Sequence, residues 1–167
     1  MIADKNARGF ATLEVVLSLF LLTSGVAAVL WLQQSALLQQ RQQLLRHVAI
    51  GLAEDLAERM VFNAAHAPLY ARSWGQSSTT KGVDCVAQPC TLPDLAAWDM
   101  QQFQTALNTQ LPQGDANVFA LATYPGWWGI VVAWQDPQQN LPAPDDSLTP
   151  ACPQHTSCWR LWLHPQR

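Results

Sequence analysis

The chain has 167 residues, of which 49% are hydrophobic and only 13% are charged, and its formal net charge is -3. This length and composition suit one anchored domain rather than several domains. From Pro68 onward, four basic residues stand against seven acidic ones. This part therefore lacks the basic surface that nucleic-acid binding requires, and we expect no nucleic-acid partner.

The first predicted element is an uncharged helix over residues 15–32, whose only polar side chains are Ser18, Thr23 and Ser24. As a helix, 18 residues span about 27 Å, close to the roughly 30 Å of a bilayer's hydrocarbon core. Backbone amides in lipid must bond internally, which favours a helix. A secretory signal would be followed by a small-residue cleavage site, and nothing convincing of that kind follows Leu32. The segment is predicted to be one retained membrane span.

One carboxylate, that of Glu14, lies where this apolar run begins, within Arg8-Gly9-Phe10-Ala11-Thr12-Leu13-Glu14. As an ordinary acid at a helix start, it would gain about 0.3–1 kcal/mol from the helix dipole. Acidic groups inside membranes, however, usually serve a function.

This motif resembles the type IV prepilins: a short leader ending in glycine, then phenylalanine, then glutamate as the fifth residue counted from that phenylalanine, then an apolar helix. The resemblance implies cleavage by prepilin peptidase between Gly9 and Phe10, N-methylation of Phe10, and pairing of Glu14 with the N-terminal amine of a neighbouring subunit. It also implies a single-pass inner-membrane protein with a cytoplasmic N-terminus and a periplasmic head, which later enters a pilus filament.

Beyond the span, apolar residues recur at spacings of three and four at Leu45, Val48, Leu52, Leu56 and Met60. This period predicts an amphipathic continuation of the helix, from near residue 10 to about residue 67, with an apolar stripe that holds a globular head. Two glycines, Gly25 and Gly51, are candidate bends. The predicted organisation is a leader at 1–9, a membrane and assembly segment at 10–32, an amphipathic half at 33–67 and a head at 68–167.

The head is predicted to begin with a loop at 68–82. Thr91-Leu92-Pro93-Asp94 indicates the start of a second helix, with a hydroxyl cap, a proline in the first turn and an acid three residues later. That helix would end near Leu111, and its apolar period runs through Leu95, Trp98 or Asp99, Phe103, Leu107 and Leu111.

Strands are expected at 118–124 and 127–135 around Pro125-Gly126, and at 158–164 after a long proline-rich loop. The predicted fold class is α+β and type IV pilin-like, with a long N-terminal helix, a second helix and a small antiparallel sheet. Trp98, Trp134, Trp159 and Trp162 are expected to pack between sheet and helix. Trp74, Trp127 and Trp128 are expected at a loop or turn, where an aromatic patch would suit contact with another pilin.

The four cysteines are Cys85, Cys90, Cys152 and Cys158. In an oxidising compartment they would form disulfides, and three pairings are possible. The local pairs, Cys85 with Cys90 and Cys152 with Cys158, are favoured because each would close a loosely held loop, while the cross-pairings stay open. A zinc site at Cys152, His155 and Cys158 is the weaker reading, because structural zinc sites usually have two-residue cysteine spacers. We expect no metal and no cofactor.

A second resemblance covers the centre of the chain. Cys85-Val86-Ala87-Gln88-Pro89-Cys90-Thr91, Asp94-Leu95-Ala96-Ala97-Trp98-Asp99 and Leu111-Pro112-Gln113-Gly114 resemble PilV-type minor pilins. This resemblance implies a subunit that helps prime pilus assembly and lies at or near the filament tip. The implied partners are prepilin peptidase, other minor pilins, the major pilin and inner-membrane lipid. The alternatives are a pseudopilin of a type II secretion system and a single-pass adhesive or binding module.

The titratable residues predict no enzyme. His47 and His66 fall in the helical stretch, while His155 and His164 fall in a loop and at a strand end. The carboxylates of Asp145 and Asp146 are expected to be solvated, and a calcium site is the alternative hypothesis. No arrangement of these groups indicates a nucleophile or a general base.

Overall fold

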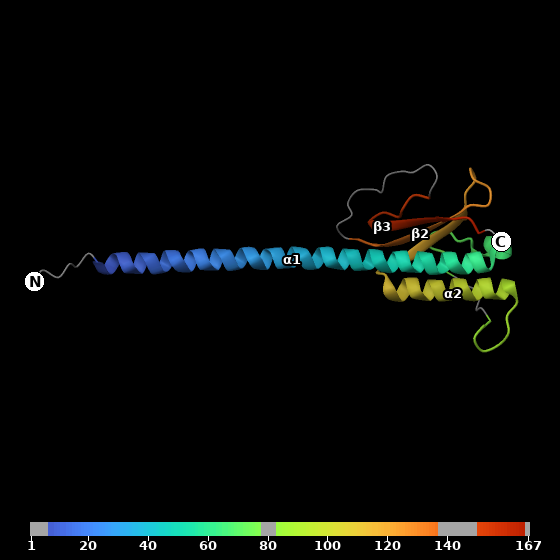
Figure 1. Ribbon diagram of the computed structural model, residues 1–167, viewed down its shortest axis with the longest axis horizontal. Coiled ribbons are helices and arrows are strands. Elements are labelled where there is room, and N and C mark those ends of the chain that lie inside the picture. The colour runs from blue at the N-terminus through green and yellow to red at the C-terminus, as the bar shows by residue number, and fades with distance from the viewer. Residues whose placement is uncertain (1–6, 78–82, 137–149, 166–167) are drawn as a thin grey trace, which may run out of the picture. The chain divides into compact units, whose positions relative to one another are not determined.

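The computed structural model describes residues 7–77, 83–136 and 150–165, with side chains from Thr12 onward. Contacts divide the chain into two compact units, Met1–Gln42 and Gln43–Arg167. Helix α1, Ala7–Phe62, carries residues of both units (Figure 1). It is followed by the 3₁₀ helix η1, Ala64–Tyr70, by helix α2, Leu92–Gln110, and by three strands.

The first helix ends five residues before the predicted position. Asn63 leaves the helical conformation (φ -111°, ψ 39°), and η1 then contains Pro68, which has no backbone N–H to donate. The side chain of Asn63 instead donates to the carbonyl of Leu92, at 2.9 Å. α1 ends where a polar side chain is held by the start of α2, and it continues as an α-helix through both Gly25 and Gly51.

The predicted start of α2 is confirmed. The Thr91 side chain accepts from the Asp94 backbone N–H, and the Asp94 carboxylate accepts from the Thr91 backbone N–H. Pro93 lies in the first turn, where its missing N–H costs nothing. This capping box satisfies two backbone donors that a helix start would otherwise leave unpaired.

The sheet contains β1, Asp115–Ala120, β2, Trp128–Gln135, and β3, Thr156–Leu163, in the antiparallel order β1-β2-β3. The expected strand at 118–124 is wrong in its bounds, because β1 starts three residues earlier and residues 121–127 form the connection. Gly126 has φ +83° there, a value that L side chains rarely adopt. The predicted α+β, type IV pilin-like fold is confirmed.

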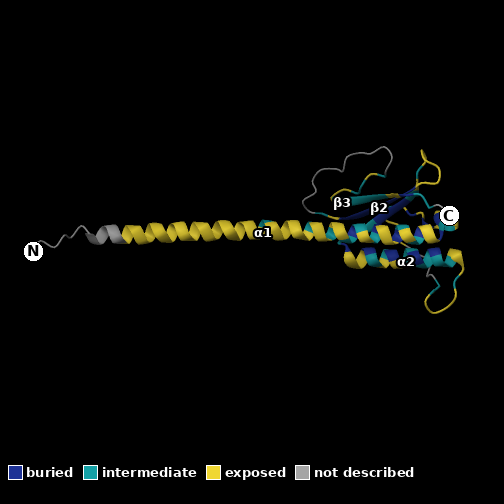
Figure 2. Cartoon of the chain, viewed as in Figure 1, coloured by how far each residue is buried: buried dark blue, intermediate teal, exposed yellow. Residues whose placement is uncertain are grey.

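The core of the second unit lies between the last turns of α1, α2 and one sheet face, where dark blue residues gather in Figure 2. The buried apolar stripe of α1 is narrower than predicted. Leu56 and Met60 are fully buried, whereas Leu45, Val48 and Leu52 are partly buried at the margin of the core. Between them α1 buries two alanines, Ala49 and Ala53. Small side chains there allow the helix to approach its neighbours closely.

The tryptophans divide differently from the prediction. Trp134 is buried and Trp159 packs against the core, as expected, but Trp128 belongs to β2 and is only 8% exposed. Trp98 is half-buried, and Asp99 takes the core-facing position next to it. Trp162 lies on the other sheet face, and 36% of its surface is exposed.

Candidate functional site

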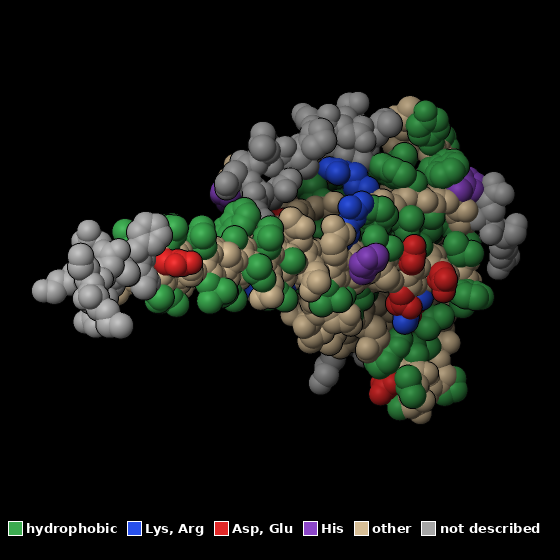
Figure 3. Space-filling model, turned by 60° about the vertical axis from the view of Figure 1, so that its left-hand side comes forward, with side chains coloured by type: hydrophobic (Ala, Val, Ile, Leu, Met, Phe, Trp, Pro, Cys, Tyr) green, Lys and Arg blue, Asp and Glu red, His purple; other side chains and the backbone are tan. Residues whose placement is uncertain are grey.

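The apolar part of α1 is the first candidate site. The helix is long and apolar enough to cross a membrane by length and composition, with a mean hydropathy of 2.4 in its best window. Leu17, Phe20 and Trp31 are each more than half exposed, and Figure 3 shows hydrophobic side chains along the visible face of this segment. Such a surface requires an apolar environment that the unit does not itself supply.

The hydroxyl groups in this segment are satisfied within the helix. Ser18 donates to the carbonyl of Glu14 at 2.7 Å, Thr23 to that of Phe20 at 3.0 Å, and Ser24 to that of Leu21 at 2.9 Å. An unpaired hydroxyl in hydrocarbon would be costly, and these local bonds remove that cost. The three polar residues are therefore compatible with a membrane span.

Glu14 is the one acidic residue of this segment. It is exposed, and among the described residues its carboxylate has no hydrogen-bond or ion-pair partner. Gly9 and Phe10 lie in the first turns of α1, but the Phe10 side chain is outside the described part, as are residues 1–6 of the predicted leader. The cleavage, methylation and pairing roles of these three residues stay predictions.

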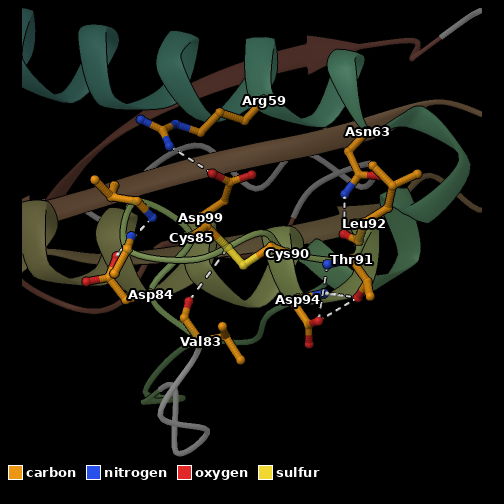
Figure 4. Close-up of a disulfide and its surroundings, with 12 residues drawn as sticks. Arg59, Asn63, Val83, Asp84, Cys85, Cys90, Thr91, Leu92, Asp94 and Asp99 are labelled. Atoms are coloured by element: carbon orange, nitrogen blue, oxygen red, sulfur yellow. Dashed lines mark hydrogen bonds and ion pairs between the residues drawn. A yellow bond between two sulfur atoms is a disulfide. The ribbon is translucent and has the colours of Figure 1, made fainter.

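A buried polar network joins α1, η1 and α2 in the second unit. Asp99, only 4% exposed, accepts from Arg59 Nη1 at 2.8 Å (Figure 4). It also accepts from the Tyr70 hydroxyl at 2.7 Å. Asn63 Nδ2 lies 3.4 Å from the same hydroxyl. Arg59 also bonds Asp55 one turn earlier in α1. One carboxylate thus links three elements.

These contacts shift two pKa values. The hydrogen bonds from Arg59 to Asp55 and then to Asp99 raise the pKa of the Arg59 guanidinium above its usual range. Burial is the largest cause of a raised pKa at Tyr70, and the neighbouring Asp99 adds to it. Arg59 therefore stays charged and Tyr70 stays neutral at physiological pH.

A separate ion pair, between Arg72 and Asp115, holds the segment after η1 against β1. Arg72 Nη2 lies 2.7 Å from Asp115 Oδ1, and the backbone N–H of Gly75 donates to the other carboxylate oxygen at 2.7 Å. Burial lowers the pKa of Arg72, and the interaction with Asp115 opposes that effect. This pair fixes a stretch that the sequence predicted only as loop.

Both local disulfides are present in the structure. Cys85 bonds Cys90 and Cys152 bonds Cys158, with Cα separations of 5.3 and 6.4 Å. The first closes a loop directly before the capping box of α2 (Figure 4). Since Cys152 and Cys158 are bonded to each other, they are not thiolate ligands, which overturns the zinc reading with His155.

No group of three or more metal-ligating side chains occurs in the described ranges. The alternative calcium site at Asp145-Asp146 lies outside them. The described histidines are dispersed: His66 contacts Asn63, and His164 packs against the Trp127 ring.

The sequence missed the polar network. One sign of the network was visible in the sequence, because Asp99 falls on the apolar period of α2. The adjacent Trp98 was an equally good candidate for that buried position, so the carboxylate was not singled out. Asn63 and Tyr70 gave no local pattern, since their partners are distant in the sequence.

A long N-terminal apolar helix and a small disulfide-bonded α+β head define a pilin-like class of protein. The family described as Type IV pilin Tt1218 matches residues 31–101, a range that contains Arg59, Tyr70, Asp99 and the Cys85–Cys90 loop. This match supports a type IV pilin-like protein, and with it a pilin role and assembly with other pilins. Neither a curated protein nor a solved structure matches the chain.

Proposed function

We propose that the chain is a minor pilin of a type IV pilus and that it resembles the PilV type. Such a subunit would help prime pilus assembly and would lie at or near the filament tip. Prepilin peptidase would cleave it between Gly9 and Phe10, and Phe10 would then be N-methylated. The observation that carries the proposal is the position of these residues and of Glu14 at the start of an apolar helix that is continuous with a helix of the head.

The proposed role of Glu14 follows from its environment. An unpaired carboxylate at the start of a membrane span is costly unless it meets a cation. After cleavage, the new ammonium group of a neighbouring subunit's Phe10 would supply that cation. Assembly would thereby neutralise both charges.

Replacing Glu14 tests this role. We expect Glu14→Ala and Glu14→Gln to insert and to be cleaved normally, yet to be depleted from sheared filaments, because neither retains the carboxylate. Ser18→Ala, one turn further along the same helix, removes a local hydrogen bond but no charge and should join filaments normally. Normal incorporation of Glu14→Gln would contradict the proposed pairing.

The leader supplies a separate test. Gly9→Lys should block cleavage and leave the chain in the membrane, since the resemblance places the scissile bond after Gly9. Unchanged localisation and function of this variant would instead favour an anchored binding module that never joins a filament.

A further inference from the structure

The two edges of the sheet differ. At the outer edge of β1, Arg72 and Val118 exchange two backbone hydrogen bonds of 2.8 Å each. Arg72 is 7% exposed and is also held by Asp115. That edge is therefore already paired in part by a segment of the same chain.

These bonds also establish which way each strand's backbone groups point. Because Val118 directs its N–H and C=O at Arg72, it cannot direct them at its β2 partner Ile130. The bond from Leu121 N–H to the Trp127 carbonyl, 2.9 Å, continues the ladder in the same phase. In antiparallel sheets such pairs alternate, so Ile130 directs its backbone groups at β3.

The register of β3 then identifies its outward residues. Ile130 is opposite Leu161, so Leu161 points its backbone groups at β2. The bond from Asp136 N–H to the His155 carbonyl, 3.2 Å, agrees with this phase. The residues between them in the alternation point their N–H and C=O groups away from β2; they are Thr156, Cys158, Arg160 and Trp162. No backbone hydrogen bond to the N–H or C=O groups of these four residues occurs within residues 7–77, 83–136 and 150–165.

Within the described residues, β3 has little of the usual protection of an edge strand. Natural proteins protect exposed edges with charges, prolines, bulges or very short strands. β3 has eight residues, TSCWRLWL, with one charge and no proline. The prolines nearest to it in the sequence are Pro153 and Pro165. Its residues are mostly half-buried, in contrast to the buried β2.

The single charge indicates the chemistry of a partner. Arg160 takes part in none of the three ion pairs found among the described residues, and its Nη2 contacts Cys152 Sγ at 3.3 Å. A carboxylate on an incoming strand would complement it. Pairing of two copies centred on this strand would place two Arg160 side chains together, which is unfavourable for like charges.

We infer that β3 is a docking edge for an extended strand of a different pilus subunit, one that carries a carboxylate opposite Arg160. The partner would bond the outward backbone groups of Cys158, Arg160 and Trp162 and would pack an apolar side chain on the exposed part of Trp162. This inference rests on the proposed function, because it takes the partner to be a neighbouring subunit of the pilus.

The test uses the full chain in the membranes of cells that produce it. A benzophenone amino acid at position 162 is irradiated, and the cross-linked peptides are identified by mass spectrometry. We expect a cross-link to an acidic, extended segment of another subunit. The same probe at exposed Gln102 on α2 should not yield that peptide.

Two substitutions then separate backbone pairing from side-chain contact. Arg160→Ala removes the charge and keeps the N–H, whereas Arg160→Pro removes both. Because the N–H of Arg160 points away from β2, proline there leaves the sheet's own ladder intact. We expect about two- to tenfold less cross-link for Arg160→Pro than for Arg160→Ala, the range that one hydrogen bond gives. Equal yields from two variants with the same melting temperature would overturn the inference.

Amide hydrogen exchange on the unsubstituted chain covers the case in which Arg160→Pro does not fold. The amides of Arg160 and Trp162 should exchange more slowly in assembled material than in the detergent-solubilised chain. Equal exchange in both, or a cross-link only to a second copy, would overturn the proposal. A chain that begins at Phe10 but shows no β3 pairing refutes this inference alone, whereas paired β3 with an intact Met1 refutes the filament role alone.

Discussion

The two halves of α1 have the same backbone and opposite environments. In the first unit the helix exposes its apolar side chains all round, as at Leu21 and Leu22, and satisfies its hydroxyls locally. In the second unit it buries a stripe of Ala49, Ala53, Leu56 and Met60, all at 0% exposure. Continuity of a helix therefore does not imply one stabilising mechanism: one half requires lipid or other subunits, and the other half packs in its own head.

The largest expected effect is on the buried carboxylate of the head. Asp99→Ala removes the acceptor of Tyr70 and one of the two partners of Arg59. We expect the free energy of unfolding to fall by about 2–4 kcal/mol, because buried donors lose their partners. Urea unfolding of the detergent-solubilised chain, followed by tryptophan fluorescence, measures this change.

Asp55→Ala is the matched control, because Asp55 bonds the same guanidinium from an exposed position. Its loss should cost less than about 1 kcal/mol. Equal costs for the two variants would mean that burial of Asp99 is not what stabilises the head.

Gly129 gives the next largest effect. A Cβ at this position of β2 would lie 2.5 Å from Phe119 and 2.6 Å from Trp162, which pack edge to face over it. Gly129→Val should destabilise the head by about 1–3 kcal/mol through overpacking. Gly25→Ala, in the membrane segment with open space around it, should leave head unfolding unchanged. An unchanged midpoint for Gly129→Val would refute the packing of the two rings.

Tyr70 predicts that the stability of the head depends on pH in the alkaline range. Its pKa is raised in the folded head, chiefly by burial, so its contribution to stability is complete below its ordinary pKa of about 10. As the pH rises above that value, the unfolded chain releases a proton that the folded head retains. Stability should then fall by up to about 1.4 kcal/mol per pH unit until the folded pKa is reached.

Unfolding measured between about pH 8 and pH 11.5 tests this prediction around the ordinary tyrosine pKa. Tyr70→Phe should flatten the alkaline slope, whereas Tyr124→Phe, at the exposed second tyrosine, should keep it. The same slope in both variants would assign the effect to other groups.

The smallest expected effect is that of replacing Gly51 in the part of α1 that packs in the head. Gly51 lies on the exposed face of the helix in the second unit, and a Cβ added there would meet nothing within 4 Å. Gly51→Ala should stabilise the head by about 0.5–1 kcal/mol, because alanine is the better helix former. A loss of stability would contradict the regular helix and the open space around Gly51.

Local signals explain what the sequence predicted well. The capping box at Thr91 and Asp94 involves residues three apart, so the start of α2 is visible in the sequence. The prediction of β3 at 158–164 was also close, since β3 ends at Leu163 and begins two residues before Cys158.

Long-range contacts explain the features that could not be predicted from the sequence. The end of α1 depends on Asn63 bonding Leu92, 29 residues later, and no local pattern reveals that bond. β2 is buried on both faces, so it lacks the alternation that would have distinguished Trp128 in the strand from Trp127 in the connection. The choice between Trp98 and Asp99 depended on Tyr70 and Arg59, which approach from other elements.

The most direct test of the proposed function is the mass of the N-terminal peptide, recovered from sheared surface filaments of cells that retain their native peptidase. We expect a peptide that begins at methylated Phe10, which would demonstrate both processing and entry into the filament. Absence of the chain from the filaments, together with an intact Met1 in the membrane fraction, would contradict it.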